Sequence, residues 1–297
     1  MTRKLSLVQV DVFTDRALAG NSLAVILDGR GLTTEQMQAI ALEMNLSETT
    51  FILPGDAAAD RTRGTRVRIF TVQEELPFAG HPTLGTAFVL RGDSGASEVK
   101  LDLNVGIVPV RFTQAESSAL AFGEMTQIDP EFGEIHEADA VAAVTNLKVG
   151  DLAAAAPIQT VSTGLAYTIV PVRTLKALQE LRLDVPRALE YLERSGGKFF
   201  YFVSRETVDP KARLHARMIF YNGEDPATGS AAGCASGWMV AHAIAASDER
   251  VIIEQGLEMH RPSSIFVHAA KRDNQVVNVR VGGNCVEVLR GEISLTL

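Results

Sequence analysis

Apolar and polar side chains alternate in several short runs within the first 125 residues of the chain. The clearest runs are residues 67–70, 100–103 and 108–112, and a period of two is typical of strands with one buried face. We expect these runs to form a mixed or antiparallel sheet.

Two helices interrupt these strands. Thr33 has the spacing of a capping box, and the residues after it carry apolar side chains at helical intervals through position 44. A second helix should begin near His81, because Pro82 suits the first turn, and Gly92 should end it. We expect the first helix to pack on the sheet.

The second half of the chain repeats this pattern after an acidic, Ala-rich stretch, residues 127–156, that is poor in strand formers. Strands are predicted at 159–161, 166–172, 199–203 and 213–220, helices at 175–181, 187–194 and 229–244, and four short strands from there to the end. We therefore predict an N-terminal lobe, 1–125, which the last strand, about 288–297, would complete, and a C-terminal lobe, 126–287.

The two Gly-rich segments at the predicted helix starts also resemble each other in sequence. Residues 77–87 and 225–235 each run from proline through glycine and a polar residue to small residues. Chance is the alternative explanation, because Gly and Ala are common in this chain. We favour two related lobes.

Composition narrows the class of protein. The net charge of −8, without a Lys/Arg cluster, argues against nucleic acid, and no apolar run is long enough to cross a membrane. The N-terminus lacks a secretory signal pattern and there are only two cysteines, so we expect a cytoplasmic protein with reduced thiols. Neither a metal-ligand pattern nor a nucleotide-binding loop is found. Small molecules are the expected partners, with no cofactor.

The two glycine turns are candidate anion sites. A Gly-rich turn that opens a helix presents unpaired N–H groups and the positive end of the helix dipole, so Gly80 and Gly229 would suit a carboxylate. The alternative is that both merely make tight turns. His81 directly follows Gly80, where the dipole favours a neutral ring that can orient a substrate.

Two carboxylates and a serine complete the candidates. Glu48 stands where a helix has ended and a strand begins, so partial desolvation in a cleft would raise its pKa toward that of a general base. Asp225 could cap the following helix, accept from a substrate amine or hydroxyl, or do both. Ser230 could donate at the same helix start or serve only as a capping residue.

Five motifs in order resemble the PhzF-like phenazine-biosynthesis family. They are residues 10–14, 20–21, 45–51 (Asn-Leu-Ser-Glu-Thr-Thr-Phe), 78–83 (Phe-Ala-Gly-His-Pro-Thr) and 224–231 (Glu-Asp-Pro-Ala-Thr-Gly-Ser-Ala). The resemblance covers nearly the whole chain. Two places depart from the pattern: Ser22 stands where proline is usual, and the segment from Met218 to Glu224 is short.

The resemblance implies an α+β fold of the diaminopimelate-epimerase type, with two pseudo-symmetric lobes, each a curled, mostly antiparallel sheet around a central helix. It also implies a homodimer and a cofactor-independent isomerase similar to trans-2,3-dihydro-3-hydroxyanthranilate isomerase, acting on a small carboxylate-bearing substrate. Glu48 matches the catalytic glutamate that moves the proton. His81, Asp225 and Ser230 match residues that orient the substrate, and Gly80 and Gly229 would supply backbone donors.

Two alternatives remain open. Epimerase relatives use two cysteines on opposite faces of the substrate, and the matching places here hold Gly80-His81 and Ser230-Ala231. Neither Cys234 nor Cys285 is placed to act as a base. An amino-acid racemase or epimerase is therefore the weaker enzymatic hypothesis, and the other is a metabolite-binding member without turnover.

Overall fold

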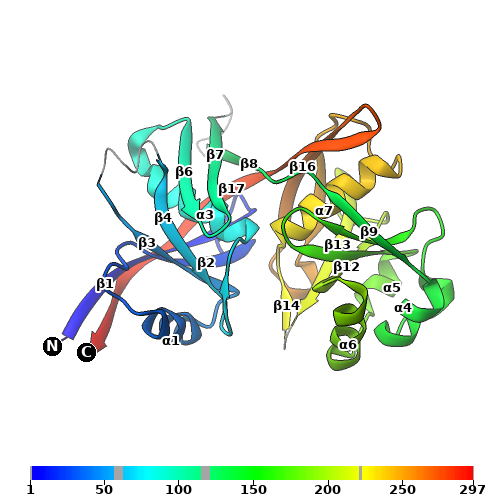
Figure 1. Cartoon of the computed structure of the whole chain (residues 1–297), viewed down its shortest axis with the longest axis horizontal. Helices are drawn as coiled ribbons and strands as arrows, with labels where there is room; N and C mark the ends of the chain where they lie inside the picture. The colour runs from blue at the N-terminus through cyan, green and yellow to red at the C-terminus, as the bar shows by residue number, and fades with distance from the viewer. Residues whose placement is uncertain (1, 57–62, 115–120, 221–222, 297) are drawn as a thin grey trace. The chain divides into compact units, whose positions relative to one another are not determined.

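In the computed structural model, close contacts divide the chain into two compact units, and the description covers residues 2–56, 63–114, 121–220 and 223–296. Unit 1 comprises Met1–Thr126 and Gly282–Leu297, and unit 2 comprises Gln127–Val281. Each unit has its own set of paired strands and its own buried helix (Figure 1).

Unit 1 is built from strands around helix α3. Its elements are β1 (Thr2–Val12), β2 (Asn21–Ile26), α1 (Thr34–Met44), β3 (Glu48–Leu53), β4 (Thr65–Phe70), β5 (Glu75–Leu76), α3 (Gly80–Arg91), the 3-10 turn η1 (Gly92–Ser94), β6 (Glu98–Leu103), β7 (Gly106–Gln114) and β8 (Ala121–Thr126). Helix α3 contacts β1, β2, β3, β6, β7 and β8, whereas α1 contacts the sheet through β3 and β4 (Figure 1).

Local sequence signals explain both helices of unit 1. Thr33 and Gln36 form the predicted capping box of α1, and Gly92 is the C-cap of α3. The first eight residues of α3 are buried, and a Cβ at Gly85 would lie 2.7 Å from the Leu23 side chain. Small residues therefore let α3 lie close against the strands.

Unit 2 has its own buried helix, α7. Its elements are β9 (Glu131–His136), α4 (Ala138–Thr145), η2 (Val149–Asp151), β10 (Ile158–Ser162), β11 (Ala166–Val172), α5 (Leu175–Gln179), α6 (Val185–Ser195), β12 (Phe199–Ser204), β13 (Ala212–Phe220), β14 (Gly223–Asp225), α7 (Gly229–Ala241), β15 (Val251–Gln255), η3 (Leu257–Met259) and β16 (Ser263–Arg272). Nearly every residue of α7 is buried. Helices α4, α5 and α6 lie around a separate core that includes Phe200 and Phe202 (Figure 1).

The strands are paired in the same order in both units. In unit 1, β2 is parallel to β3, β4 and β5 follow antiparallel, and after α3 strand β6 returns parallel to β4 and pairs with β7. In unit 2, β11 is parallel to β12, β13 and β14 follow antiparallel, and after α7 strand β15 returns parallel to β13 and pairs with β16. One topology therefore occurs twice, as the repeat in the sequence indicated.

Two strand predictions need correction. The predicted series of four short strands at the C-terminus is wrong, because after β15 and β16 the chain continues as one strand, β17 (Gln275–Thr296). Gly282 and Gly283 look like a turn, yet they lie within β17 where a Cβ would approach Gly123 O at 2.6 Å and Phe13 Cδ1 at 2.7 Å. Within 127–156, where no strand was predicted, β9 pairs with β10.

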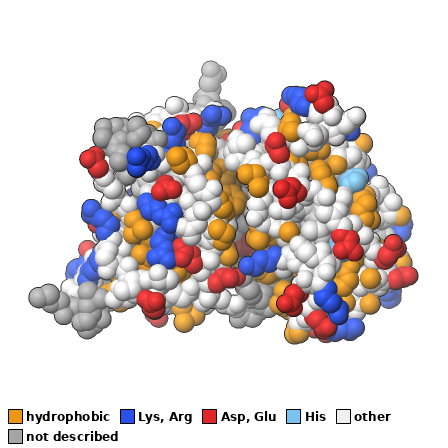
Figure 2. All heavy atoms as spheres, viewed as in Figure 1, with side chains coloured by type: hydrophobic (Ala, Val, Ile, Leu, Met, Phe, Trp, Pro, Cys, Tyr) orange, Lys and Arg blue, Asp and Glu red, His pale blue; other side chains and the backbone are white. Residues whose placement is uncertain are grey.

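Within the described part of the chain, every helix is too short or too polar to span a bilayer. On the face shown in Figure 2, acidic and basic side chains are interspersed with apolar ones.

Candidate active site

Glu48 is placed by the end of α1 and the start of β3. Asn45, the C-cap of α1, has φ 51°, a left-handed conformation that turns the chain, and three residues later β3 begins at Glu48. Strand pairing with β2 sets Glu48 opposite Leu23, and the Glu48 side chain is only 11% exposed. The predicted junction position is therefore observed, and it places the carboxylate in a largely buried site.

His81 lies next to this carboxylate. It is the second residue of α3, and its Nε2 is 3.3 Å from Oε2 of Glu48. Asn21 Nδ2 lies 3.1 Å from His81 Nδ1, so the amide holds the ring at the nitrogen other than the one beside Glu48. Asn21, at the start of β2, was part of a quoted motif, but its contact with His81 had no signal in the sequence.

Burial determines the charge of His81. Desolvation lowers the pKa of the ring to about 3, and a hydrogen bond with the Ser22 backbone only partly opposes this. The ring is therefore neutral near pH 7, and Glu48 lies beside an uncharged imidazole. Ser22, which stands where proline is usual in the family, makes a side-chain hydrogen bond of its own: its hydroxyl donates to Asp11 Oδ1 at 2.8 Å.

Both buried helices begin at glycine without a side-chain cap. The N-cap of α3 is Ala79 and that of α7 is Thr228, and neither makes a side-chain capping hydrogen bond among the residues that the structure describes. Gly80 and Gly229 are the first residues of these helices. Uncapped first-turn N–H groups are the donors that an anion can use.

Asp225 and Ser230 belong to unit 2 and have close partners there. Asp225, 5% exposed, accepts a 2.6 Å hydrogen bond from the Thr228 hydroxyl through Oδ2. The N-cap of α7 is Thr228, and Pro226 and Ala227 separate Asp225 from the helix start, so of the two roles considered for Asp225 the N-cap position is not the one observed. Ser230 Oγ lies 2.7 Å from the hydroxyl of Tyr167.

Matched positions show how the two units differ. Strand register equates Arg68 and Glu75 of unit 1 with Arg217 and Glu224 of unit 2, and both pairs form two-bond ion pairs. By the same strand register, Glu48 of unit 1 corresponds to Phe199 of unit 2. As the second residues of α3 and α7, His81 corresponds to Ser230. Unit 1 therefore holds the carboxylate and imidazole, and unit 2 lacks both at the equivalent positions.

The two thiols are poorly suited to proton transfer. Cys234 in α7 and Cys285 in β17 are both buried. Burial raises the pKa of the Cys234 thiol to about 11 and moves that of Cys285 in the same direction. Both therefore stay protonated near pH 7, which disfavours a mechanism with two thiolate bases.

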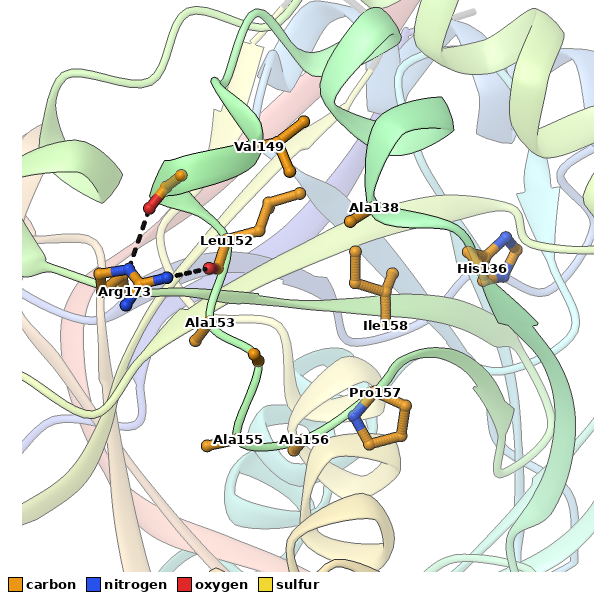
Figure 3. A pocket seen from close by; sticks show the side chains of 12 residues that line it. His136, Ala138, Val149, Leu152, Ala153, Ala155, Ala156, Pro157, Ile158 and Arg173 are labelled. Atoms are coloured by element: carbon orange, nitrogen blue, oxygen red, sulfur yellow. Dashed lines mark hydrogen bonds between the residues drawn. The ribbon is translucent and has the colours of Figure 1, made fainter.

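One cavity in the described part of the chain lies away from the candidate site residues. A cavity of about 670 Å³ in unit 2 is lined by His136, Arg173 and the Ala153–Pro157 run (Figure 3). The Arg173 guanidinium donates to the Gly150 and Leu152 carbonyls there, so its donors are directed at the backbone (Figure 3). No predicted site residue lines this cavity, and the described residues contain no cluster of His, Cys, Asp and Glu that could hold a metal ion.

Comparison with known proteins shows which family the chain resembles over its length. Residues 10–291 match the family described as phenazine biosynthesis-like protein. The chain is 38% identical to an uncharacterized isomerase of Mesorhizobium japonicum, over 95% of this chain and 96% of that protein. It is 34% identical to the trans-2,3-dihydro-3-hydroxyanthranilate isomerase of Pseudomonas chlororaphis, over 97% and 99%. A PhzF-family phenazine biosynthesis protein from Bacillus anthracis superposes with a TM-score of 0.87, at 27% identity over 98% and 99%.

The chain therefore has the two-unit α+β fold of this group and falls in a class of isomerases. It belongs to the phenazine biosynthesis-like, or PhzF, family. The predicted family, fold class and isomerase class are confirmed, whereas the roles of individual residues remain predictions.

Proposed function

We propose that the protein isomerises a small carboxylate-bearing substrate, with Glu48 removing a proton from one carbon and returning it to another. The observation that carries this proposal is the Glu48–His81–Asn21 arrangement, in which a largely buried carboxylate faces a neutral imidazole held from behind by an amide. A carboxylate in such surroundings is suited to general base and acid steps at neutral pH.

Each partner has a distinct part in this mechanism. Glu48 takes the proton, and because one group can carry it to a second carbon on the same face, no second base is required. The His81 N–H orients Glu48 and the reacting group, while Asn21 holds the ring. N–H groups at the start of α3 receive substrate oxygen. In unit 2, Asp225, Ser230 and the helix start at Gly229 are proposed to orient the substrate.

The names of the relatives support a substrate class. Proteins of three Pseudomonas species at 31–34% identity are named trans-2,3-dihydro-3-hydroxyanthranilate isomerase. We propose that this chain acts on a ring carboxylate of the same kind, in which loss and return of a proton shifts a double bond. A homodimer in the cytoplasm is proposed on the same family grounds.

The first experiment compares Glu48→Gln with wild type on trans-2,3-dihydro-3-hydroxyanthranilate. We expect turnover by wild type and a loss of at least about 10³-fold in kcat for Glu48→Gln, because an amide cannot accept the proton. Glu43→Gln is the matched control, since Glu43 is an exposed glutamate on α1. Turnover in Glu48→Gln close to that of wild type would overturn the proposed role of Glu48.

A further inference from the structure

The side-chain amide of Gln255 lies next to Asp225, and all of its hydrogen-bond donors have partners. It is the last residue of β15, and its side chain is inaccessible to solvent. Its Nε2 donates to Asp225 O at 2.7 Å and to Thr228 Oγ1 at 2.9 Å, and its Oε1 accepts from Thr228 N at 3.2 Å and from the Tyr201 hydroxyl at 3.0 Å. A primary amide has two N–H donors, so both are used inside unit 2.

Two backbone partners fix the orientation of this amide. The Thr228 N–H can only donate and the Asp225 carbonyl can only accept, so exchanging the oxygen and nitrogen of Gln255 would break both bonds. Nε2 must therefore donate to Thr228 Oγ1. The single hydroxyl hydrogen of Thr228 is then committed to Asp225 Oδ2. The direction of the chain from Gln255 through Thr228 to Asp225 is thus determined.

Tyr201 supports this direction from the other end. Burial and the nearby Asp225 charge raise the pKa of Tyr201, so its hydroxyl keeps its proton and donates to Gln255 Oε1. Such a chain in a buried place orients each member more strictly than a single bond would.

Unit 1 shows that the fold does not need this chain. The topology and the helix start are the same there, but the matched residues cannot form the chain. Position by position, Asp225 corresponds to Leu76, Thr228 to Ala79, Gln255 to Leu103 and Tyr201 to Thr50. Three of these four residues of unit 1 are apolar, and the hydroxyl of the fourth, Thr50, pairs with that of Thr86 inside α3. A purely structural demand of the turn therefore does not explain them.

We propose that Gln255 and Thr228 are positioning residues that hold the Asp225 carboxylate in one orientation, with Oδ2 accepting from Thr228. The carboxylate held in this way receives an ammonium or hydroxyl donor of the substrate. The substrate part rests on the proposed function. The hydrogen-bond chain itself rests only on unit 2.

The test follows the ionisation of Asp225 by carbon NMR in protein labelled at the aspartate carboxyls, with Asp225→Asn identifying the signal. Thr228→Val keeps the shape of the residue and removes the donor to Oδ2. Because that bond favours the ionised carboxylate, the titration midpoint of Asp225 should move to higher pH in Thr228→Val and stay in place in Thr228→Ser. An unchanged midpoint in Thr228→Val overturns the proposal.

Controls separate this effect from general damage and from other charges. Thr145→Val removes another buried threonine hydroxyl of unit 2, which donates to Val141 O, and should leave the midpoint unchanged. If Thr228→Val does not fold, Thr228→Ala, with the residue found at position 79, replaces it and carries the same expectation. The ionisable groups on strands β11 to β15 and on α7, besides Asp225, are Tyr167 on β11, Tyr201 on β12, Arg213, His215 and Arg217 on β13, Glu224 on β14, Glu254 on β15 and Cys234 on α7. They are the same in all variants.

A kinetic cycle tests the role in catalysis. If Thr228 acts through Asp225, Thr228→Val should lower kcat/KM about tenfold in wild type and have little further effect in Asp225→Asn. Equal losses in both backgrounds would contradict positioning through Asp225. Absence of wild-type turnover would count against the proposed function alone, because the titration decides the hydrogen-bond chain without substrate.

Discussion

At the scale of single residues, the surroundings of a side chain determine whether it is neutral or charged near pH 7. His81 and His215 show this most clearly. His81 is desolvated without a carboxylate bond strong enough to compensate, and its pKa falls to about 3. His215 is equally buried but lies between Glu254 at 2.8 Å and Glu258 at 3.0 Å, and these carboxylates raise its pKa to about 9 despite desolvation. The same side chain is therefore neutral in unit 1 and a cation in unit 2.

The neutrality of His81 predicts a pH profile. With its pKa near 3, His81 does not change charge between pH 5 and pH 9, so it contributes no limb to the profile in that range. His81→Gln should lower kcat/KM about 10²-fold through loss of an oriented donor and leave the shape of the profile unchanged. Steady-state kinetics across this range check it. A limb near pH 6.5 that vanishes in the variant would show that His81 titrates.

The thiols yield the second prediction at this scale. Cys234→Ser should keep kcat/KM within about twofold of wild type, because the buried thiol is protonated and its hydrogen bonds to Thr163 and the Leu165 carbonyl can be replaced by a hydroxyl. Steady-state kinetics of wild type and Cys234→Ser measure this, with racemisation of amino acids followed in a parallel assay. Loss of turnover in Cys234→Ser, with normal folding, would favour the racemase alternative.

At the scale of elements, an Arg–Glu pair braces the turn before each buried helix. Arg68 joins β4 to Glu75 of β5 and Arg217 joins β13 to Glu224 of β14, each through Nε and Nη2. The second pair is more deeply placed, because Arg217 is 6% exposed and Arg68 18%. Arg217 also donates from Nη1 to the carbonyls of Leu178 and Leu181. The brace of unit 2 thus also holds the end of α5.

This difference predicts unequal costs for matched substitutions. Glu224→Gln leaves a nearly buried guanidinium without its charge partner and should lower the free energy of unfolding by about 3 kcal/mol. Glu75→Gln removes the partner of a more exposed arginine, and its cost should be about 1 kcal/mol. Denaturant unfolding of both variants measures this. A larger loss in Glu75→Gln would contradict the ranking by burial.

The sequence predicted local features of these elements better than distant pairings. Pro82 and Gly92 were sufficient to place α3, and the capping box placed α1. Strand β9 (Glu131–His136) is exposed except for its last residue and forms through pairing with β10, which no local pattern indicates. Likewise, Glu48 was found at a motif, but Gln255 lies 30 residues from Asp225 and was missed, because only the parallel return of β15 brings them together.

At the scale of the whole molecule, the fold uses one topology twice and assigns different chemistry to the two copies. Unit 1 carries Glu48 and His81, where unit 2 has Phe199 and Ser230. Unit 2 carries Asp225 and Gln255, where unit 1 has Leu76 and Leu103. We propose that unit 1 carries the proton-transfer group and that unit 2 holds a carboxylate in a fixed orientation for the substrate. The repeat in the sequence indicated two lobes but not this division, because strand register is needed to match the positions.

The charged His215 predicts how the stability of the protein depends on pH. Its folded-state pKa of about 9 lies above the unfolded value of about 6.5, so its contribution is complete below pH 6.5 and is lost as pH rises through about 9. We expect the thermal unfolding midpoint of wild type to fall between pH 7 and pH 10, and His215→Gln to show a smaller fall. Calorimetry over this range measures it. Equal slopes in both proteins would contradict a protonated His215.

The central claim is that one carboxylate, Glu48, carries the proton between two carbons of the substrate. The most direct measurement is turnover of trans-2,3-dihydro-3-hydroxyanthranilate in deuterium oxide, with mass and NMR analysis of substrate and product for wild type and Glu48→Gln. The account predicts deuterium at the newly protonated carbon with wild type, and neither exchange nor conversion with Glu48→Gln. Exchange into a converted substrate by Glu48→Gln would show that another group moves the proton.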